Sequence, residues 1–233
     1  MFHVEHIYMK STIRRIEKLN EIVFPFLGHF TKEQKVSFLI YHNLLKDWNS
    51  RINLISRKDV ESIIEKHFLE SISLLDVLDF PANSWVLDLG SGGGFPGLPI
   101  KILREDLHIL MIDAKRMKCL FLKKVLQDLS LIRADVICER VENVSAEFLA
   151  KFDFVVCRAV ANLAELWNLS QRFLTEDGIL VAMKGGDIEA EIDALKNQYQ
   201  NIQIRILEYS PYLELGKLDK RVVVVSRFSD RKK

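Results

Sequence analysis

The stretch that decides the fold of this 233-residue chain is residues 86–97, which read VLDLGSGGGFPG. The first four of these residues have the pattern of a buried strand, and they run directly into a turn with five glycines within eight positions. Glycine adopts positive φ angles and places no Cβ between the backbone and a ligand. The helix start that follows offers N–H groups that no helix carbonyl accepts. The sequence therefore predicts a strand, loop and helix that hold a nucleotide-like cofactor.

Outward from this stretch, short apolar strands alternate with amphipathic helices, which is typical of a parallel sheet covered on both faces. The sequence predicts strands at Trp85–Leu89, Leu107–Ile112, Ala134–Cys138, Phe154–Cys157 and Ile179–Met183, helices at Leu98–Leu103, Lys115–Leu129, Leu163–Leu174 and Ile188–Gln198, and two closing strands at Ile202–Tyr209 and Arg221–Phe228, joined by a loop with Pro211 and Gly216. This order predicts an α/β fold, the Rossmann-like, mostly parallel seven-stranded sheet of class I S-adenosylmethionine-dependent methyltransferases.

The N-terminal part of the chain has a helical pattern. Over Ser11–Leu78, apolar residues such as Ile13 recur at three- and four-residue spacing, and no strand pattern is present. One helix is predicted to begin at the cap residue Thr31, and another near Asp59, continuing through Leu75. The pattern breaks at residues 81–84, which read PANS. We therefore expect a helical N-terminal extension over residues 1–80 and a Rossmann-like methyltransferase domain over residues 81–233.

Composition restricts the class of protein. The chain has 33 basic and 32 acidic residues, so its net charge of +1 gives no overall attraction to polyanions. Three cysteines, Cys119, Cys138 and Cys157, lack a paired Cys-x-x-Cys spacing, which argues against a disulfide framework and against a metal site. The sequence shows neither a signal-peptide pattern nor the ~20 consecutive apolar residues of a membrane span. We expect a cytoplasmic protein.

Two classes of cofactor fit a glycine-rich loop of this kind. Residues 92–97 satisfy the G-x-G-x-x-G pattern of dinucleotide sites. However, the strand is expected to end at Leu89, before that pattern begins, and Pro96 removes a donor from the helix start that a pyrophosphate would need. The carboxylate of Asp88 would repel a pyrophosphate but could help to hold a cationic amino acid. The pattern favours S-adenosylmethionine over a nicotinamide dinucleotide and places it at Gly90, Gly92 and Gly94.

Polar residues follow the predicted strands at the sheet edge where doubly wound folds bind ligands. Asp113 follows the second strand, where it can accept hydrogen bonds from ribose hydroxyls or cap the next helix. Val141 and Glu142 follow the third strand, at the position of an adenine edge or of a plain loop. Arg158 and Lys184 end the fourth and fifth strands. Either cation can orient the cofactor carboxylate, a phosphate or the target base, or form a structural ion pair.

The sequence lacks the catalytic motifs of two other groups of methyltransferases. After the fourth strand, residues 158–162 read RAVAN, in place of the Asn/Asp-Pro-Pro-aromatic segment of enzymes that methylate the amine of adenine. Cys157 is expected inside a strand and Cys138 has no adjacent base, which argues against the nucleophilic cysteine of cytosine-C5 enzymes. What remains is a direct in-line displacement, in which the protein mainly supplies orientation.

The motifs together resemble those of the RsmG (GidB) family of ribosomal RNA guanine-N7 methyltransferases. The resemblance rests on residues 85–99, WVLDLGSGGGFPGLP, on 113–122, DAKRMKCLFL, on 140–142, RVE, on Arg158 with Ala159, and in the extension on 53–59, NLISRKD, and 67–71, HFLES. It implies methylation of guanine N7 in 16S ribosomal RNA, within the small ribosomal subunit or an assembly intermediate. It also implies cofactor contacts at Gly90, Phe95, Val141, Glu142 and Arg158. Ala114 and Glu70 depart from the family, in which serine and aspartate are common at these positions.

The implied chemistry needs no general base, because guanine N7 has a free lone pair at pH 7. No catalytic residue is assigned beyond Arg158 and Lys184 as orienting candidates. Candidates for contacts to RNA phosphates are Arg57, Lys58, His67, Lys115, Arg116, Lys123 and Lys124. For His67, a satisfied core or surface histidine is the alternative, and for the lysine-rich stretch, a solvated helix face. A monomer is expected. A small-molecule methyltransferase and a nonenzymatic RNA-binding protein remain open as alternative functions.

Overall fold

The computed structural model describes residue 14 and residues 30–158, 161–208 and 220–228. Within this part, seven strands form one sheet in the order β3-β2-β1-β4-β5-β7-β6. They are β1 (Trp85–Leu89), β2 (His108–Ile112), β3 (Ala134–Ile137), β4 (Phe152–Arg158), β5 (Leu174–Gly185), β6 (Ile202–Glu208) and β7 (Lys220–Arg227). Strand β7 pairs antiparallel with both β5 and β6, whereas the other pairs are parallel. The mostly parallel class I methyltransferase sheet predicted from the sequence is confirmed.

The strand order reverses at β1, and this reversal determines where a ligand can bind. The chain passes outward from β1 through β2 to β3 and then returns to the other side of β1 as β4, with Asp88 opposite Val156. In such sheets the ligand lies beyond the carboxyl ends of the strands at the point of reversal. The glycine loop after β1 and the end of β4 therefore meet at one edge.

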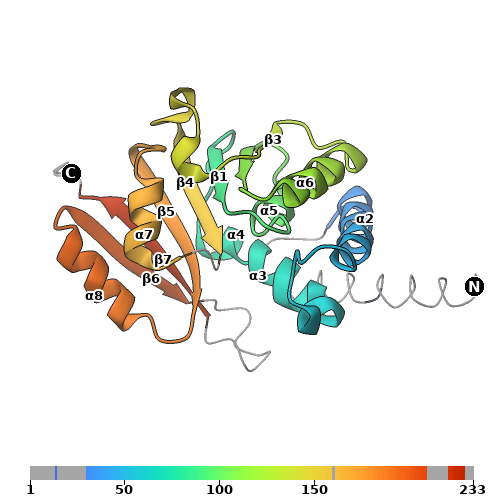
Figure 1. Cartoon of the computed structure of the whole chain (residues 1–233), viewed down its shortest axis with the longest axis horizontal. Coiled ribbons are helices and arrows are strands. Elements are labelled where there is room, and N and C mark those ends of the chain that lie inside the picture. The colour runs from blue at the N-terminus through green and yellow to red at the C-terminus, as the bar shows by residue number, and fades with distance from the viewer. Residues whose placement is uncertain (1–13, 15–29, 159–160, 209–219, 229–233) are drawn as a thin grey trace, which may run out of the picture.

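Helices cover both faces of the sheet (Figure 1). One face carries α2 (Lys32–Asn49), α3 (Leu69–Ile72), α4 (Leu74–Val77), α5 (Gly97–Leu103) and α6 (Arg116–Asp128), and the other carries α7 (Leu163–Ser170) and α8 (Glu189–Gln198). Alternate residues of each strand point to opposite faces, so Val86 joins the core beneath α2–α6 and Leu87 joins the core beneath α7 and α8. This accounts for the nearly continuous apolar strands in the sequence.

The described part of the helical extension shares a core with the sheet domain. Helix α2 begins where the sequence predicts, because Thr31 and Gln34 form a reciprocal capping box. Its buried Tyr41 packs against Phe68 and Phe95, with ring centroids 5.0 and 5.7 Å away. The same hydrophobic cluster contains core residues of α2, the glycine loop and α6. The extension is therefore packed directly beside the cofactor loop.

The prediction of one continuous helix from Asp59 to Leu75 is wrong. A 3₁₀ turn (η1, Arg57–Ser62), a π turn (η2, Ile64–Phe68) and the short helices α3 and α4 replace it. The Ser71 hydroxyl donates to the carbonyl of His67 (2.7 Å) and the Ser73 hydroxyl to that of Glu70 (2.6 Å). Such side-chain bonds to backbone carbonyls compete with regular helix geometry. The sequence pattern alone did not reveal this competition.

Several element boundaries also differ from the prediction, most of all the start of β5 at Leu174 rather than Ile179. Strand β4 begins at Phe152 rather than Phe154, and α7 ends at Ser170 rather than continuing to Leu174, which instead begins β5 and pairs with Phe152. A turn from Ser170 to Phe173 separates the two elements. The predicted helix around Ile13 and the loop with Pro211 and Gly216 lie outside the described residues. Among the helices that the structure describes, none is long and apolar enough to cross a membrane.

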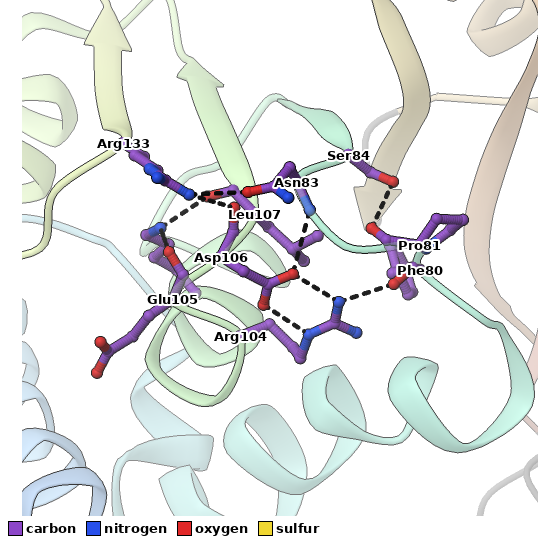
Figure 2. Close-up of polar contacts among 10 residues, drawn as sticks. Phe80, Pro81, Asn83, Ser84, Arg104, Glu105, Asp106, Leu107 and Arg133 are labelled. Carbon is purple, nitrogen blue, oxygen red and sulfur yellow. Dashed lines mark hydrogen bonds and ion pairs between the residues drawn. The ribbon is translucent and has the colours of Figure 1, made fainter.

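A polar network fixes the segment that leads into β1, at the amino end of the strands (Figure 2). The Arg104 guanidinium donates two hydrogen bonds to the Asp106 carboxylate and a third to the carbonyl of Phe80, each 2.8 Å long. Asp106 also accepts from the backbone of Asn83 (3.2 Å), whose side chain accepts from Arg133 (2.9 Å). The hydrogen bonds from Arg104 are the main reason that the pKa of Asp106 falls to about 2. The network anchors the sheet at the edge opposite the glycine loop.

Candidate cofactor site

The glycine loop lies against the end of β2 in a conformation that needs glycine. The backbone N–H groups of Gly90 and Ser91 donate to the carbonyl of Ile112, at 2.9 and 3.0 Å. The φ angles of Gly90, Gly92 and Gly94 are 71°, 57° and 94°, which side chains rarely tolerate. A Cβ on Gly94 would also lie 2.3 Å from the side chain of Leu98. Backbone conformation and space thus both restrict this loop.

Asp88 connects β1 to the start of α5. Its side chain is fully buried, and Oδ2 accepts a hydrogen bond of 2.9 Å from the backbone N–H of Gly97. A Cβ on Gly97 would lie 2.6 Å from that oxygen, so the helix start can approach the carboxyl group only with glycine at this position. The Oδ1 atom has no hydrogen-bond partner among the described residues, and burial raises the pKa of Asp88 to about 7. An unpartnered acceptor of this kind fits a cationic ligand group.

A cavity of about 390 Å³ opens beside the glycine loop, within the size range of small-molecule sites. Its lining includes Leu89, Gly90, Ile112, Asp113, Lys115, Lys118, Glu139, Arg140, Val141, Glu142 and Leu169. Four sequence-predicted cofactor residues, Gly90, Asp113, Val141 and Glu142, meet in this wall, whereas Lys118 was not predicted to lie there. The cavity dimensions and its mixed polar and apolar wall fit an adenosine group.

Asp113 contacts the glycine loop and the residue before α6 through its two carboxylate oxygens. Its Oδ2 accepts from the backbone N–H of Gly92 (3.0 Å), and its Oδ1 accepts from that of Lys115 (2.8 Å), which precedes α6. The carboxylate therefore ties the glycine loop to the residue that precedes α6, and α6 itself has no side-chain cap. Each carboxylate oxygen has a second lone pair, so the group can also accept a hydrogen bond from a ribose hydroxyl.

The segment with Val141 and Glu142 forms a 3₁₀ turn, η3 (Val141–Asn143), and the side chain of Arg172 binds its backbone. The guanidinium of Arg172 donates to the backbone carbonyls of Val141 and Glu142. Sequence reasoning missed Arg172, because its contact partner lies 31 residues away and no local pattern marks it. The turn is therefore fixed by a distant side chain.

Arg158 and Phe95 lie together beside the glycine loop. The Arg158 guanidinium carbon is 4.7 Å from the Phe95 ring centroid. Its nitrogens donate to the Lys66 carbonyl (3.3 Å), to Glu70 Oε2 (3.1 Å) and to His67 Nδ1 (2.7 Å). The residue that ends β4 therefore connects the cofactor loop to the helical extension.

The position of His67 corrects the expectation that it contacts an RNA phosphate. Its side chain is buried and stacks on Phe95, with ring centroids 5.0 Å apart. Burial, reinforced by the charge of Arg158, lowers the pKa of His67 to about 3. A buried, neutral imidazole offers no charge to a phosphate. The position is that of a core histidine, the alternative considered for this residue, but it is not a fully satisfied one, because Nε2 has no hydrogen-bond partner among the described residues.

Lys184 does not line the cavity. Its Nζ donates to the carbonyl of Ala161 (2.8 Å) and lies 2.7 Å from Glu191, which also accepts a hydrogen bond from the Leu163 backbone. Lys184 thus ties the end of β5 to the starts of α7 and α8. This contact has the geometry of the structural ion pair that the sequence left open.

The remaining RNA-binding candidates are exposed. Arg57 and Lys58 lie in η1, and Lys115, Arg116, Lys123 and Lys124 lie at the start and along the outer face of α6. Lys124 forms an ion pair of 2.6 Å with Asp128 one turn later. The structure brings Lys115 to the mouth of the cavity and leaves the others on the surface, where a large ligand could reach them.

Comparisons with solved structures agree with the fold. The sheet resembles that of a SAM-dependent methyltransferase from Aquifex aeolicus, with a TM-score of 0.54, 14% identity, and coverage of 75% of this chain and 100% of that chain. It also resembles TYW2 from P. horikoshii in complex with MeSAdo, with a TM-score of 0.55, 13% identity, and coverage of 77% and 66%. At these identities the likeness concerns the fold alone.

Sequence relatives are more specific. The ribosomal RNA small subunit methyltransferase G of Syntrophus aciditrophicus is 37% identical over 195 residues, which cover 82% of this chain and 80% of that protein. The protein of the same name from Clostridium botulinum is 38% identical over 165 residues, with coverage of 70% and 69%. The family model described as rRNA small subunit methyltransferase G matches residues 34–214, and the chain therefore belongs to this family.

Proposed function

We propose that this chain transfers the methyl group of S-adenosylmethionine to N7 of a guanine in the 16S RNA of the small ribosomal subunit. The observation that carries the proposal is the cavity in which Gly90, Asp113, Val141 and Glu142 meet, in a chain of this family. The relatives are named for methylation of small-subunit ribosomal RNA. The choice of guanine N7 follows from the resemblance to the family.

The residues of the site divide between the two ends of the cofactor. We infer that Asp113 accepts hydrogen bonds from the ribose hydroxyls, and that Val141 and Glu142, which line the same cavity, contact the adenine. We infer that Arg158, whose guanidinium lies beside the glycine loop, binds the charged amino-acid end, with Asp88 buried beneath the same loop. When bound, S-adenosylmethionine supplies an electrophilic methyl group on its sulfonium.

The cysteine near the end of β4 is not suited to act as a nucleophile, in agreement with direct transfer. Cys157 is buried in β4, and its burial raises the thiol pKa to about 12, far from the thiolate that covalent catalysis needs. Guanine N7 has its own lone pair and needs no deprotonation. The contribution of the protein is then to align the two reactants and to exclude water between them.

The proposed RNA surface is local. With a net charge of +1, the chain as a whole does not attract RNA, so exposed cations such as Arg57, Lys58, Lys115, Arg116 and Lys123 would provide the phosphate contacts. Recognition would then depend on the shape of the ribosomal RNA within the subunit or an assembly intermediate. A ribosomal substrate implies action in the cytoplasm, and we expect the protein to act as a monomer.

The test is methyl transfer from labelled S-adenosylmethionine to small subunits and to their stripped RNA, both from cells that lack this protein, with the product nucleoside identified by mass. Recovery of 7-methylguanosine supports the proposal and identifies which substrate is used. Absence of label from both, with cofactor binding measured separately by calorimetry, would contradict it. Label in small metabolites would favour a small-molecule methyltransferase, and absence of cofactor binding would favour a nonenzymatic RNA-binding protein.

A further inference from the structure

Glu70 lies between two cations beside the glycine loop. Its Oε2 is 3.1 Å from Arg158 at the end of β4, and its Oε1 is 2.9 Å from Lys220 at the start of β7. With the His67 and Phe95 contacts of Arg158, these residues form what we call the Arg158 cluster: His67, Glu70, Phe95, Arg158 and Lys220. The cluster joins the extension, the glycine loop and two strands, although its members are far apart in the sequence.

The hydrogen bonds of the cluster fix the direction of the Arg158 guanidinium. Arginine has five N–H donors and no acceptor, so His67 Nδ1 must accept and the imidazole proton lies on Nε2. Three of the five donors bind Glu70, His67 and the Lys66 carbonyl. The other two have no hydrogen bond to the residues that the structure describes. Arg158 is thus held on one side and has donor capacity left on the other.

The charges of the cluster do not balance. Arg158 and Lys220 are positive, Glu70 is the one negative member, and His67 is neutral, so the two cations share one carboxylate within the cluster. Outside the cluster, the carboxyl groups of Asp59 and Asp88 also interact with the Arg158 charge. The Arg158 and Glu70 side chains are only 14% and 6% exposed. A cation with little access to water is stabilised by an anionic partner. The carboxylate at the amino-acid end of S-adenosylmethionine is such a partner.

We propose that Glu70 and His67 are positioning residues, which hold the Arg158 guanidinium flat against Phe95 with its remaining donors directed at the carboxylate of bound S-adenosylmethionine. The inference rests on the proposed function for the identity of the cofactor. It assigns the helical extension a part in cofactor binding, because both positioning residues belong to it. Holding the guanidinium in place before binding lowers the entropy lost when the carboxylate binds.

The first test is Glu70→Gln, which removes the negative charge and keeps the side-chain size. Loss of a negative charge by itself would strengthen binding of a carboxylate, whereas loss of the Arg158 orientation weakens it. We expect binding of S-adenosylhomocysteine, measured by calorimetry, to weaken about tenfold, the effect of one charge-assisted hydrogen bond. Binding of 5′-methylthioadenosine, which lacks the amino-acid end, should stay within about twofold of wild type.

Three further variants complete the design. Glu70→Asp keeps the charge and should recover most of the affinity for S-adenosylhomocysteine. Glu65→Gln makes the same chemical change at an exposed position of the same π turn and should change neither affinity. If Glu70→Gln does not fold, His67→Phe carries the same test, because it keeps a ring against Phe95 and removes the acceptor for Arg158.

Each outcome is decisive. Unchanged or tighter binding of S-adenosylhomocysteine by Glu70→Gln would overturn the proposal, and so would an equal loss for 5′-methylthioadenosine, which indicates general damage to the site. A selective loss, rescued by Glu70→Asp, supports it. If the wild-type protein binds the cofactor but methylates no ribosomal RNA, the proposed function fails, while the comparison of the two ligands still tests the positioning role.

Discussion

Two buried titratable side chains beside the glycine loop should make the stability of the fold depend on pH in opposite directions. Burial lowers the pKa of His67 from 6.5 to about 3 and raises that of Asp88 from 3.8 to about 7. Between pH 7 and pH 5, the unfolded chain therefore binds more protons at His67 than the native chain, and fewer at Asp88. Acidification destabilises the native state through His67 and stabilises it through Asp88.

The two contributions are similar in size. The neutral state of His67 stabilises the fold above pH 6.5, and going from pH 7 to pH 5 removes about 2 kcal/mol of that stabilisation. The stabilising protonation of Asp88 is lost as the pH rises through about 7, so the same acidification adds about 2 kcal/mol. The two effects nearly cancel in the wild-type chain, and replacing one residue should expose the effect of the other.

The assay is urea unfolding of the wild type, His67→Phe and Asp88→Asn at pH 5 and pH 7. Asparagine at position 88 keeps an oxygen that can accept from the Gly97 backbone. For each protein we take the free energy of unfolding at pH 5 minus that at pH 7, so that the direct cost of the substitution cancels. Relative to the wild type, this difference should rise by about 2 kcal/mol in His67→Phe and fall by about 2 kcal/mol in Asp88→Asn.

Glu65→Gln, which changes an exposed carboxylate, is the control and should reproduce the wild-type difference. The reasoning is refuted if both site variants also reproduce it, since neither group would then titrate differently in the native and unfolded states. A change of the same sign in both variants would refute the opposing assignment of the two protonation states.

Three further predictions concern packing, anchoring and RNA contact. Gly97→Ala would place a methyl group 2.6 Å from the Asp88 carboxyl oxygen. We therefore expect the free energy of unfolding, measured in urea, to fall by about 2 kcal/mol and S-adenosylmethionine to bind more weakly. An unchanged free energy of unfolding and an unchanged affinity would contradict the close approach. Arg104→Met removes the hydrogen bonds to Phe80 and Asp106 at the opposite edge of the sheet. The free energy of unfolding should fall by about 1–3 kcal/mol, and the affinity for the cofactor should not change. A loss of affinity above tenfold would show that the two edges are coupled. Lys123→Ala changes a side chain on the exposed face of α6. In a plot of the logarithm of the affinity for ribosomal RNA against the logarithm of the salt concentration, the magnitude of the slope should fall by about 0.7–0.9. An unchanged slope would show that Lys123 does not contact the RNA.

The fold could be predicted because its determinants are local in the sequence. The apolar run of β1, the glycine turn and the helix start follow one another directly, and the alternation of strands and helices permits few topologies. The meeting of four candidate cofactor residues in one cavity could also be predicted, because Gly90, Asp113, Val141 and Glu142 each follow a strand of a parallel sheet. Strand ends of such a sheet meet at one edge, so their positions in the sequence are enough to bring them together.

The helical extension illustrates the limit of local patterns. Apolar spacing predicted helix after Asp59, and most of the segment does turn helically, but the backbone passes through 3₁₀, π and α turns. One side of the π turn, with His67 and Phe68, packs against Phe95 of the glycine loop, and the turn brings His67 and Glu70 toward Arg158. The preference for these turns depends on tertiary contacts and on serine hydroxyls bound to backbone carbonyls, which periodicity does not report.

By itself, the sequence determined the succession of strands and helices along the chain, the glycine loop and the residues that follow the parallel strands. Only the tertiary structure decided the partners of the charged side chains. Arg158 meets Glu70 across 88 residues, and the buried Lys101 ammonium satisfies two backbone carbonyls, those of Glu105 and Leu107. A strand or helix pattern reflects which face of an element is apolar, so it can be recognised from the consecutive residues of one segment. The partner of a charge depends on which distant segments packing brings within about 3 Å, and no local pattern contains that information.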